Sequence, residues 1–193
     1  MPLNALADVS DEALLVAYGN GDQQAARELT MRLTPKVLGF AVRMLHGDRA
    51  EAEDVAQEAM LRLWKIADEW RQGEAKVTTW LYRVVSNLCT DRLRKKPMVP
   101  LDGIAEPVDK AASVLEEMER NQRHTALQQA LDTLPERQKQ AVVWRHLEGL
   151  SNPEIADVMG IGVEAVESLT ARGKRALANA LAGRKNELGY NDD

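Results

Sequence analysis

The chain has 193 residues, enough for one domain or two small ones, and a formal net charge of −5. Its one cysteine excludes an internal disulfide and a cysteine-rich metal site, and the sequence shows neither a membrane-spanning apolar run nor a signal peptide, so we expect a cytoplasmic protein. A hydrophobic content of 45% fits a folded core, and the many Ala, Leu, Glu, Arg and Gln residues favour an all-α fold.

The first part of the chain predicts a short helix followed by a long one. Ser10 is placed to cap a helix that begins at Asp11, and Asp22 is placed to cap the next. Apolar residues then recur every three or four positions, at Ala26, Leu29, Leu33, Val37, Phe40 and Met44. The pair Thr34-Pro35 interrupts this stripe, so Pro35 either kinks the helix or opens a new one.

The next helix has a buried face and an acidic face. Asp48 and Glu51 form a capping-box pattern at its start. The buried face would hold Ala52, Val55, Ala56, Ala59, Met60, Leu63 and Trp64. The opposite face carries Asp54, Gln57, Glu58 and Leu61. An exposed leucine inside an acidic stripe indicates a partner surface, although a solvated face with one stray apolar residue explains it as well.

A loop over residues 67–79 leads into a long, basic helix. The loop contains Trp70 and Lys76, and the helix is expected to begin at Thr78 or Thr79 and to end near residue 94. One face of this helix carries Arg83, Asn87, Asp91 and Arg94. The segment 83–96 has a net charge of +4 on an otherwise acidic chain, which indicates contact with nucleic acid.

Three prolines, at positions 97, 100 and 107, predict an extended linker over residues 97–111. We therefore expect two small helical domains, 8–96 and 112–182, on either side of it. The core of the second domain is predicted at Leu131, Leu134, Val142, Val143, Leu147 and Leu150.

The stretch from Ser151 to about residue 181 predicts a helix-turn-helix. Ser151 and Glu154 form a capping box, and Gly160 fits a helix end that needs a left-handed backbone. The second helix would direct Val166 and Leu169 inward and, on its outer face, Ser168, Arg172 and Arg175. Such a face suits the DNA major groove, whereas an ordinary pair of crossed helices is the alternative interpretation.

In this order, these segments resemble the extracytoplasmic-function (ECF, group IV) sigma factors of bacterial RNA polymerase. The strongest matches are the runs 52–58, 79–83 and 134–137, together with Asn87 and Asp91, and the likeness covers nearly the whole chain. The resemblance implies a first domain that binds the polymerase β′ clamp and opens the promoter −10 element. It also implies a second domain that reads the −35 element and binds the β flap, with no cofactor, metal, small-molecule substrate or catalytic residue.

The resemblance assigns residues to three surfaces. The clamp-binding residues are Asp54, Gln57, Glu58 and Leu61. The −10 residues are Trp70, Lys76, Arg83, Asn87, Asp91, Arg94, Lys95 and Lys96. The −35 residues are Ser168, Ala171, Arg172, Lys174 and Arg175. Trp70 lies in the segment that matches the base-capturing loop, where it would stack on or wall an unstacked base. Core packing is the alternative for Trp70 and the expected role of Trp80.

The helix over residues 163–182 departs from the commonest family pattern. Glu167 and Leu169 stand where many members carry Arg or Lys, which leaves the −35 sequence open. The run 167–175 looks like a subgroup controlled by membrane-bound anti-sigma factors, so the resemblance also implies an anti-sigma partner.

Three other classes of protein remain as alternatives. A conventional helix-turn-helix regulator would have a sensing first domain and would not need polymerase. A sigma mimic would only titrate an anti-sigma factor, and the basic residues argue against it. An enzyme would have little to work with, since the chain has three scattered histidines and no phosphate loop or metal cluster.

Overall fold

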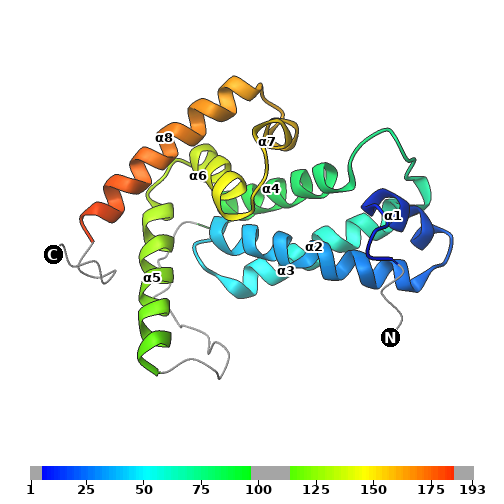
Figure 1. Ribbon diagram of the computed structural model, residues 1–193, viewed down its shortest axis with the longest axis horizontal. Helices are drawn as coiled ribbons and strands as arrows, with labels where there is room; N and C mark the ends of the chain where they lie inside the picture. The colour runs from blue at the N-terminus through cyan, green and yellow to red at the C-terminus, as the bar shows by residue number, and fades with distance from the viewer. Residues whose placement is uncertain (1–5, 97–113, 185–193) are drawn as a thin grey trace.

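The computed structural model describes residues 6–96 and 114–184, and the regular structure in these ranges is helical (Figure 1). Its elements are α1 (Asp11–Gly19), α2 (Gln23–Met44), α3 (Arg49–Ile66), the 3-10 turn η1 (Ala67–Glu69), α4 (Val77–Lys95), α5 (Val114–Asp132), α6 (Glu136–Val142), the π-helical segment η2 (Val143–Leu147), α7 (Asn152–Met159) and α8 (Val163–Ala182). The all-α prediction is confirmed. The predicted linker 97–111 lies outside the described residues, as do residues 112 and 113.

Side-chain caps fix the starts of the first three helices, as the sequence predicts. Ser10 Oγ accepts from the amide of Ala13 at 3.2 Å, and Asp22 Oδ1 accepts from the amide of Gln24 at 2.8 Å. Asp48 Oδ1 accepts from the amide of Glu51 at 3.1 Å. The other hydrogen bond of the predicted capping box, from the Asp48 amide to the Glu51 carboxylate, is not formed. The Asp48 amide donates to the Leu45 carbonyl, and the Glu51 carboxylate accepts from Arg92 and Lys96.

Helix α2 is continuous through Pro35, so of the two alternatives, a kink or a new helix at this residue, the new helix is wrong. Helix α4 begins at Val77, slightly earlier than expected. Lys76 at its N-cap provides no side-chain hydrogen bond, and Glu12 Oε1 of α1 accepts from the amide of Val77 at 3.0 Å. A cap that comes from 65 residues away in the chain cannot be seen in the local sequence.

Helices α1 to α4 pack around one apolar cluster, and α6, α7 and α8 form a smaller group beside it (Figure 1). The first turns of α5 project away from both groups, and their exposed apolar side chains are Val114, Leu115 and Met118. Within the part of the chain that the structure describes, no helix is both long and apolar enough to cross a membrane.

The expected core position of Leu147 is wrong, because this side chain is 39% exposed. It lies in η2, where the π-helical turn accommodates an extra residue and shifts the side chains around the helix axis. Trp144, which the apolar pattern did not single out, is fully buried in the same segment.

The two helical groups are docked against each other. Trp144 of η2 lies between Phe40 of α2 and Tyr82 of α4, and all three are buried. Thr90 Oγ1 of α4 donates to Glu136 Oε1 of α6 at 2.5 Å. The apolar cluster is therefore continuous from one group to the other.

Candidate functional site

The predicted clamp-binding residues lie together on one side of α3. Asp54, Gln57 and Leu61 are exposed, and Leu61 presents 52% of its surface. Glu58 is partly covered because it pairs with Arg62 at 2.6 Å. This face therefore presents one exposed apolar side chain, Leu61, surrounded by acidic and amide side chains, as the sequence indicated.

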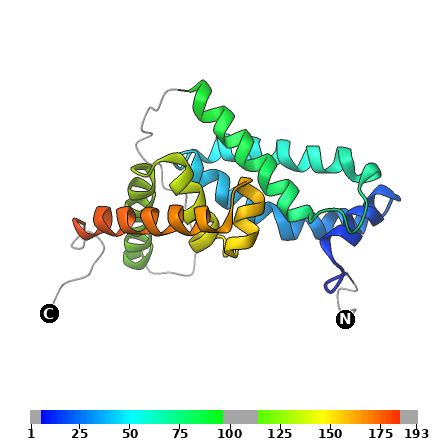
Figure 2. The same cartoon turned by 90° about the horizontal axis from the view of Figure 1, so that it is seen from above.

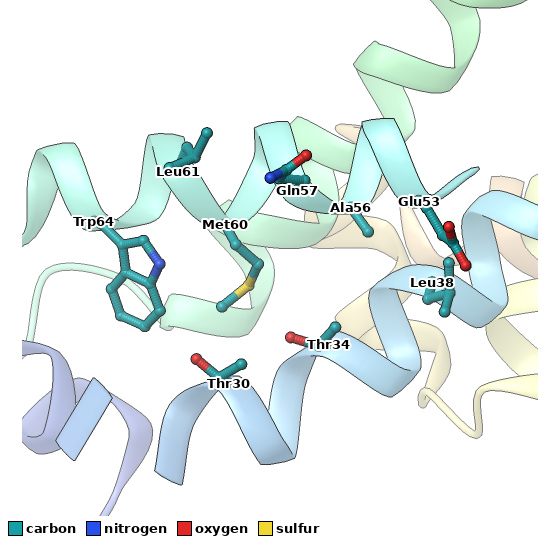
Figure 3. A pocket seen from close by; sticks show the side chains of 9 residues that line it. All are labelled: Thr30, Thr34, Leu38, Glu53, Ala56, Gln57, Met60, Leu61 and Trp64. Carbon is teal, nitrogen blue, oxygen red and sulfur yellow. The ribbon is translucent and has the colours of Figure 1, made fainter. Parts of the chain in front are cut away.

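A groove of about 290 Å³ runs between this face and α2 (Figure 3). Gln57 and Leu61 line one side of it, and the other lining residues are Thr30, Thr34, Leu38, Glu53, Ala56, Met60 and Trp64. Trp64, expected in the core, is half-buried, and its ring meets Tyr18 edge-on at 4.8 Å. The groove extends the candidate surface onto α2, which sequence reasoning missed. The polar pair Thr30 and Thr34 beside the apolar stripe was the available signal.

The predicted −10 residues of α4 follow one exposed face of the helix. Arg83, Asn87, Asp91 and Arg94 recur at helical spacing, and Lys95 is exposed beside them. Arg83 is nevertheless not free, because its Nε donates to the carbonyl oxygen of Asp157 in α7 at 2.6 Å. The docked helix α7 therefore contacts one end of this face, and Arg83 stays exposed beside it.

Trp70 and Lys76 belong to the loop between η1 and α4. The Trp70 ring is half-buried and meets Trp80 edge-on, with centroids 6.4 Å apart and planes inclined by 81°. Both rings pack against the apolar cluster, as the alternative of core packing requires. A hollow of about 400 Å³ lies beside the loop, lined by Ser10, Glu12, Gln72, Gly73, Glu74, Ala75 and Lys76. Trp70 does not line this hollow, so its base-capturing role stays a prediction.

The helix-turn-helix is formed by α7 and α8 as predicted. The Ser151 amide donates to Glu154 Oε2 at 2.8 Å, and the Glu154 amide donates to Ser151 Oγ at 3.4 Å. These bonds from Ser151 lower the pKa of the Glu154 carboxyl. Gly160 follows α7 with φ of 65°, the left-handed conformation that glycine adopts without strain.

Helix α8 presents every predicted −35 residue to solvent. The exposed set comprises Ser168, Ala171, Arg172, Lys174 and Arg175. Its inner side buries Val166 and Gly173, and Gly173 closely approaches Val142 and Gln138 of α6. Leu169, which was expected to face inward, is only half-buried and is not among the residues packed on the apolar cluster.

No cluster of three or more metal-ligating side chains occurs within 6–96 and 114–184. The surfaces built above carry basic, amide, hydroxyl and apolar groups suited to binding.

Comparison with protein families gives two separate matches. Residues 29–97 match sigma-70 region 2, and residues 124–177 match sigma-70 region 4. The first match contains α3, α4 and the loop between them, whereas the second contains the helix-turn-helix.

Curated relatives are similar over nearly the whole chain. The RNA polymerase sigma-H factor of Pseudomonas aeruginosa is 33% identical over 187 residues, covering 91% of this chain and 96% of the relative. The ECF RNA polymerase sigma factor SigM of Mycobacterium tuberculosis is 34% identical over 175 residues, covering 89% of this chain and 85% of the relative. The chain belongs to the ECF family of RNA polymerase sigma factors. As a sigma factor, it directs core polymerase to promoters.

A solved structure shares the fold of this sigma factor. It is the sigma factor RpoE of Bartonella quintana in complex with the anti-sigma factor NepR, with a TM-score of 0.66, 18% identity, and coverage of 81% of this chain and 96% of that chain. This likeness supports the helical architecture described above.

Proposed function

We propose that this sigma factor works through two units, 8–96 and 112–182, joined by residues 97–111. The first unit binds the β′ clamp and opens the −10 element, and the second reads the −35 element and binds the β flap. Bound in this way, the chain has no catalytic role of its own, needs no cofactor, and acts in the cytoplasm, where polymerase and promoter DNA are.

The clamp-binding role rests on the α3 face and the adjoining groove. Leu61 is 52% exposed and lies in a rim formed by Asp54, Gln57 and Glu58. An exposed apolar residue beside a groove of about 290 Å³ provides an anchor position for a partner side chain.

The −10 role rests on the exposed face of α4 and the loop before it. Asn87 offers both a donor and an acceptor to a base edge, and Arg83, Arg94 and Lys95 provide cations for phosphates. The set is completed by Lys76, Asp91, Lys96 and Trp70, and Trp70 lies in the segment that matches the base-capturing loop.

The −35 role rests on α8. Ser168, Ala171, Arg172, Lys174 and Arg175 are exposed on the second helix of a helix-turn-helix, the element that such motifs insert in the major groove. Arg172 would supply the base-reading contact, because guanidinium pairs bidentately with guanine.

An anti-sigma factor would hold this protein inactive. The RpoE relative binds NepR, and the docking of α7 on α4 offers a conformation for such a partner to stabilise. The run 167–175 suggests a membrane-bound partner.

The exposed Leu61 in its acidic rim is the observation that carries this proposal, and transcription with purified core polymerase tests it. The wild-type chain is expected to give promoter-specific transcripts. Leu61→Glu should weaken core binding in a competition assay without lowering the melting temperature, because Leu61 is outside the core. Met31→Glu introduces the same charge at an apolar side chain that is 72% exposed and outside the groove, so it is the control. Tight promoter binding unchanged by core polymerase would instead favour a conventional regulator.

A further inference from the structure

Four cationic side chains lie within five positions at the C-terminal end of α4, namely Arg92, Arg94, Lys95 and Lys96. They form two pairs with different surroundings. Arg94 and Lys95 are exposed, and neither makes an ion pair within the described ranges. Arg92 and the C-cap residue Lys96 both pair with Glu51 of α3, and their side chains are 31% and 67% exposed. The two pairs therefore have the same charge and different surroundings.

One carboxylate of α3 contacts both cations on the inner side. Arg92 donates to Glu51 Oε2 at 2.5 Å, and Lys96 donates to Glu51 Oε1 at 2.5 Å. Glu58 lies farther away, 3.9 Å from Arg92. The hydrogen bonds from Lys96 and then Arg92 lower the pKa of the Glu51 carboxyl, so this group is ionised at neutral pH.

The contacts of the Glu51 side chain are not needed to cap α3. The amide of Glu51 is already bonded to Asp48, so the start of α3 is satisfied without the Glu51 side chain. The side chain is only 20% exposed, and each of its oxygens has a charged donor. The arginine and the lysine that donate to this carboxylate are the kind of donors that bind a phosphate of the DNA backbone.

We propose that Glu51 is an internal counter-anion that occupies a phosphate-binding site formed by Arg92 and Lys96. A DNA phosphate that binds both cations at once must displace the carboxylate between them, so the free chain engages fewer phosphates than its basic residues suggest. This inference deepens the proposed function, because it rests on α4 being a DNA-binding helix.

The position of the site explains why such a group is useful. The docked helix α7 contacts Arg83 in the first half of α4, whereas the last turns of α4 project from the body of the protein (Figure 2). Without Glu51, this projecting end would present four cations to any duplex, and of these Arg92 alone would keep a carboxylate, that of Glu58, within 4 Å in the described ranges. Cation count sets non-specific affinity, because each phosphate neutralised releases counterions.

Glu51→Gln tests the proposal, since it removes the charge and keeps a side chain of the same shape. Binding of the free, full-length chain to duplex DNA without a promoter is measured over a series of salt concentrations. We expect Glu51→Gln to bind roughly fivefold more tightly at low salt, with a plot of log K against log salt steeper by about 1 to 2. Glu119→Gln removes the same charge from a pair on α5, 3.9 Å from Arg123, and should leave the slope unchanged.

Lysine variants identify which cations are responsible for the tighter DNA binding expected of Glu51→Gln. Lys96→Gln should weaken wild-type binding less than Lys95→Gln does, because Glu51 competes with a phosphate for Lys96 and pairs with no other lysine of this helix end. In the Glu51→Gln background, Lys96→Gln should weaken binding as strongly as Lys95→Gln does. A slope for Glu51→Gln equal to that of Glu119→Gln, or weaker binding, would overturn the proposal. Promoter-specific transcription by the same wild-type preparation shows separately whether the proposed function stands.

Discussion

The indole of Trp144 in η2 stacks on the phenyl ring of Phe40 in α2, with centroids 3.8 Å apart and planes inclined by 9°. The Tyr82 ring of α4 lies 4.6 Å from the same indole. Phe40 and Tyr82 belong to the region 2 match, and Trp144 belongs to the region 4 match. The stack therefore joins the two parts of the chain that match sigma-70 regions 2 and 4, and it must break before they separate.

Trp144→Leu should favour the separated form of the chain. The change keeps an apolar side chain but removes two ring contacts, each worth about 0.5–1.5 kcal/mol. We expect a larger radius of gyration for the free protein in small-angle X-ray scattering. Ile155→Val trims a buried side chain of α7 and keeps all three rings of the stack, so it should leave the radius unchanged. An unchanged radius for Trp144→Leu would show that the stack does not hold the two parts together.

Tying α4 to α6 should block initiation. Thr90 and Glu136 are hydrogen-bonded across the two parts, so Thr90→Cys and Glu136→Cys place two thiols near each other. A short, cleavable thiol-reactive linker between them would hold α7 over Arg83. We expect no promoter-specific transcript from the linked protein and recovery after cleavage.

The native thiol should not interfere with this experiment. Burial raises the pKa of Cys89 to about 12, and a protonated, buried thiol reacts slowly with such reagents. The wild-type chain treated with the same linker is the control. Full activity of the linked protein would mean that the docked form already engages promoter DNA.

Gly173→Ala should destabilise the helix-turn-helix domain. A Cβ at this position would lie 2.5 Å from Val142 Cγ2 and 3.2 Å from the Gln138 carbonyl oxygen, so α6 and α8 would have to move apart. We expect a cost of about 1–3 kcal/mol in thermal or urea unfolding. Val142→Ala alone costs stability through lost burial, yet it should relieve part of the Gly173→Ala penalty. Simple additivity of the two changes would argue against the close crossing.

The capping box of α7 should make the helix-turn-helix sensitive to acid. The pKa of Glu154 is lower in the folded chain than its ordinary value of 4.5, so the unfolded chain binds the proton more readily. The stabilisation is therefore complete above about pH 4.5 and is lost as the pH falls through the folded pKa. Ser151→Ala should cost about 1 kcal/mol at neutral pH and should flatten this acid dependence in urea titrations. An unaltered acid profile in Ser151→Ala would contradict this role of the box.

Local signals in the sequence were enough to predict most helix starts and the surface residues. Ser10, Asp22 and Ser151 cap the helices that they were expected to cap, because a cap depends on neighbours within three residues. The exposed positions on α3 and α8 follow from helical spacing alone.

Long-range contacts account for what the sequence did not predict. Glu51 fits a capping box locally, yet two cations more than 40 residues away attract its carboxylate. Trp144 is buried because another domain supplies Phe40 and Tyr82, and no periodic pattern within one helix contains that information. The cap that Glu12 gives to α4 has the same origin.

Arg172 and Leu169, three residues apart on α8, should respond differently to substitution. Arg172 is exposed on the outer side, so Arg172→Ala removes no core volume and should leave the melting temperature unchanged. If it reads a guanine of the −35 element, its loss should cost about 1–3 kcal/mol in recognition, concentrated on one base pair.

Leu169→Ala should be milder than truncation of a fully buried leucine, which costs about 2–5 kcal/mol. Leu169 is half-buried and lies outside the apolar cluster, so the cavity left behind would be open to water. Melting curves and transcription from promoters with single −35 substitutions measure both effects. Uniform loss across all −35 variants in Arg172→Ala would make this residue a phosphate contact. A changed −35 preference in Leu169→Ala would place the Glu167 to Leu169 edge of α8 against the DNA, because that edge would then carry the base-reading side chains.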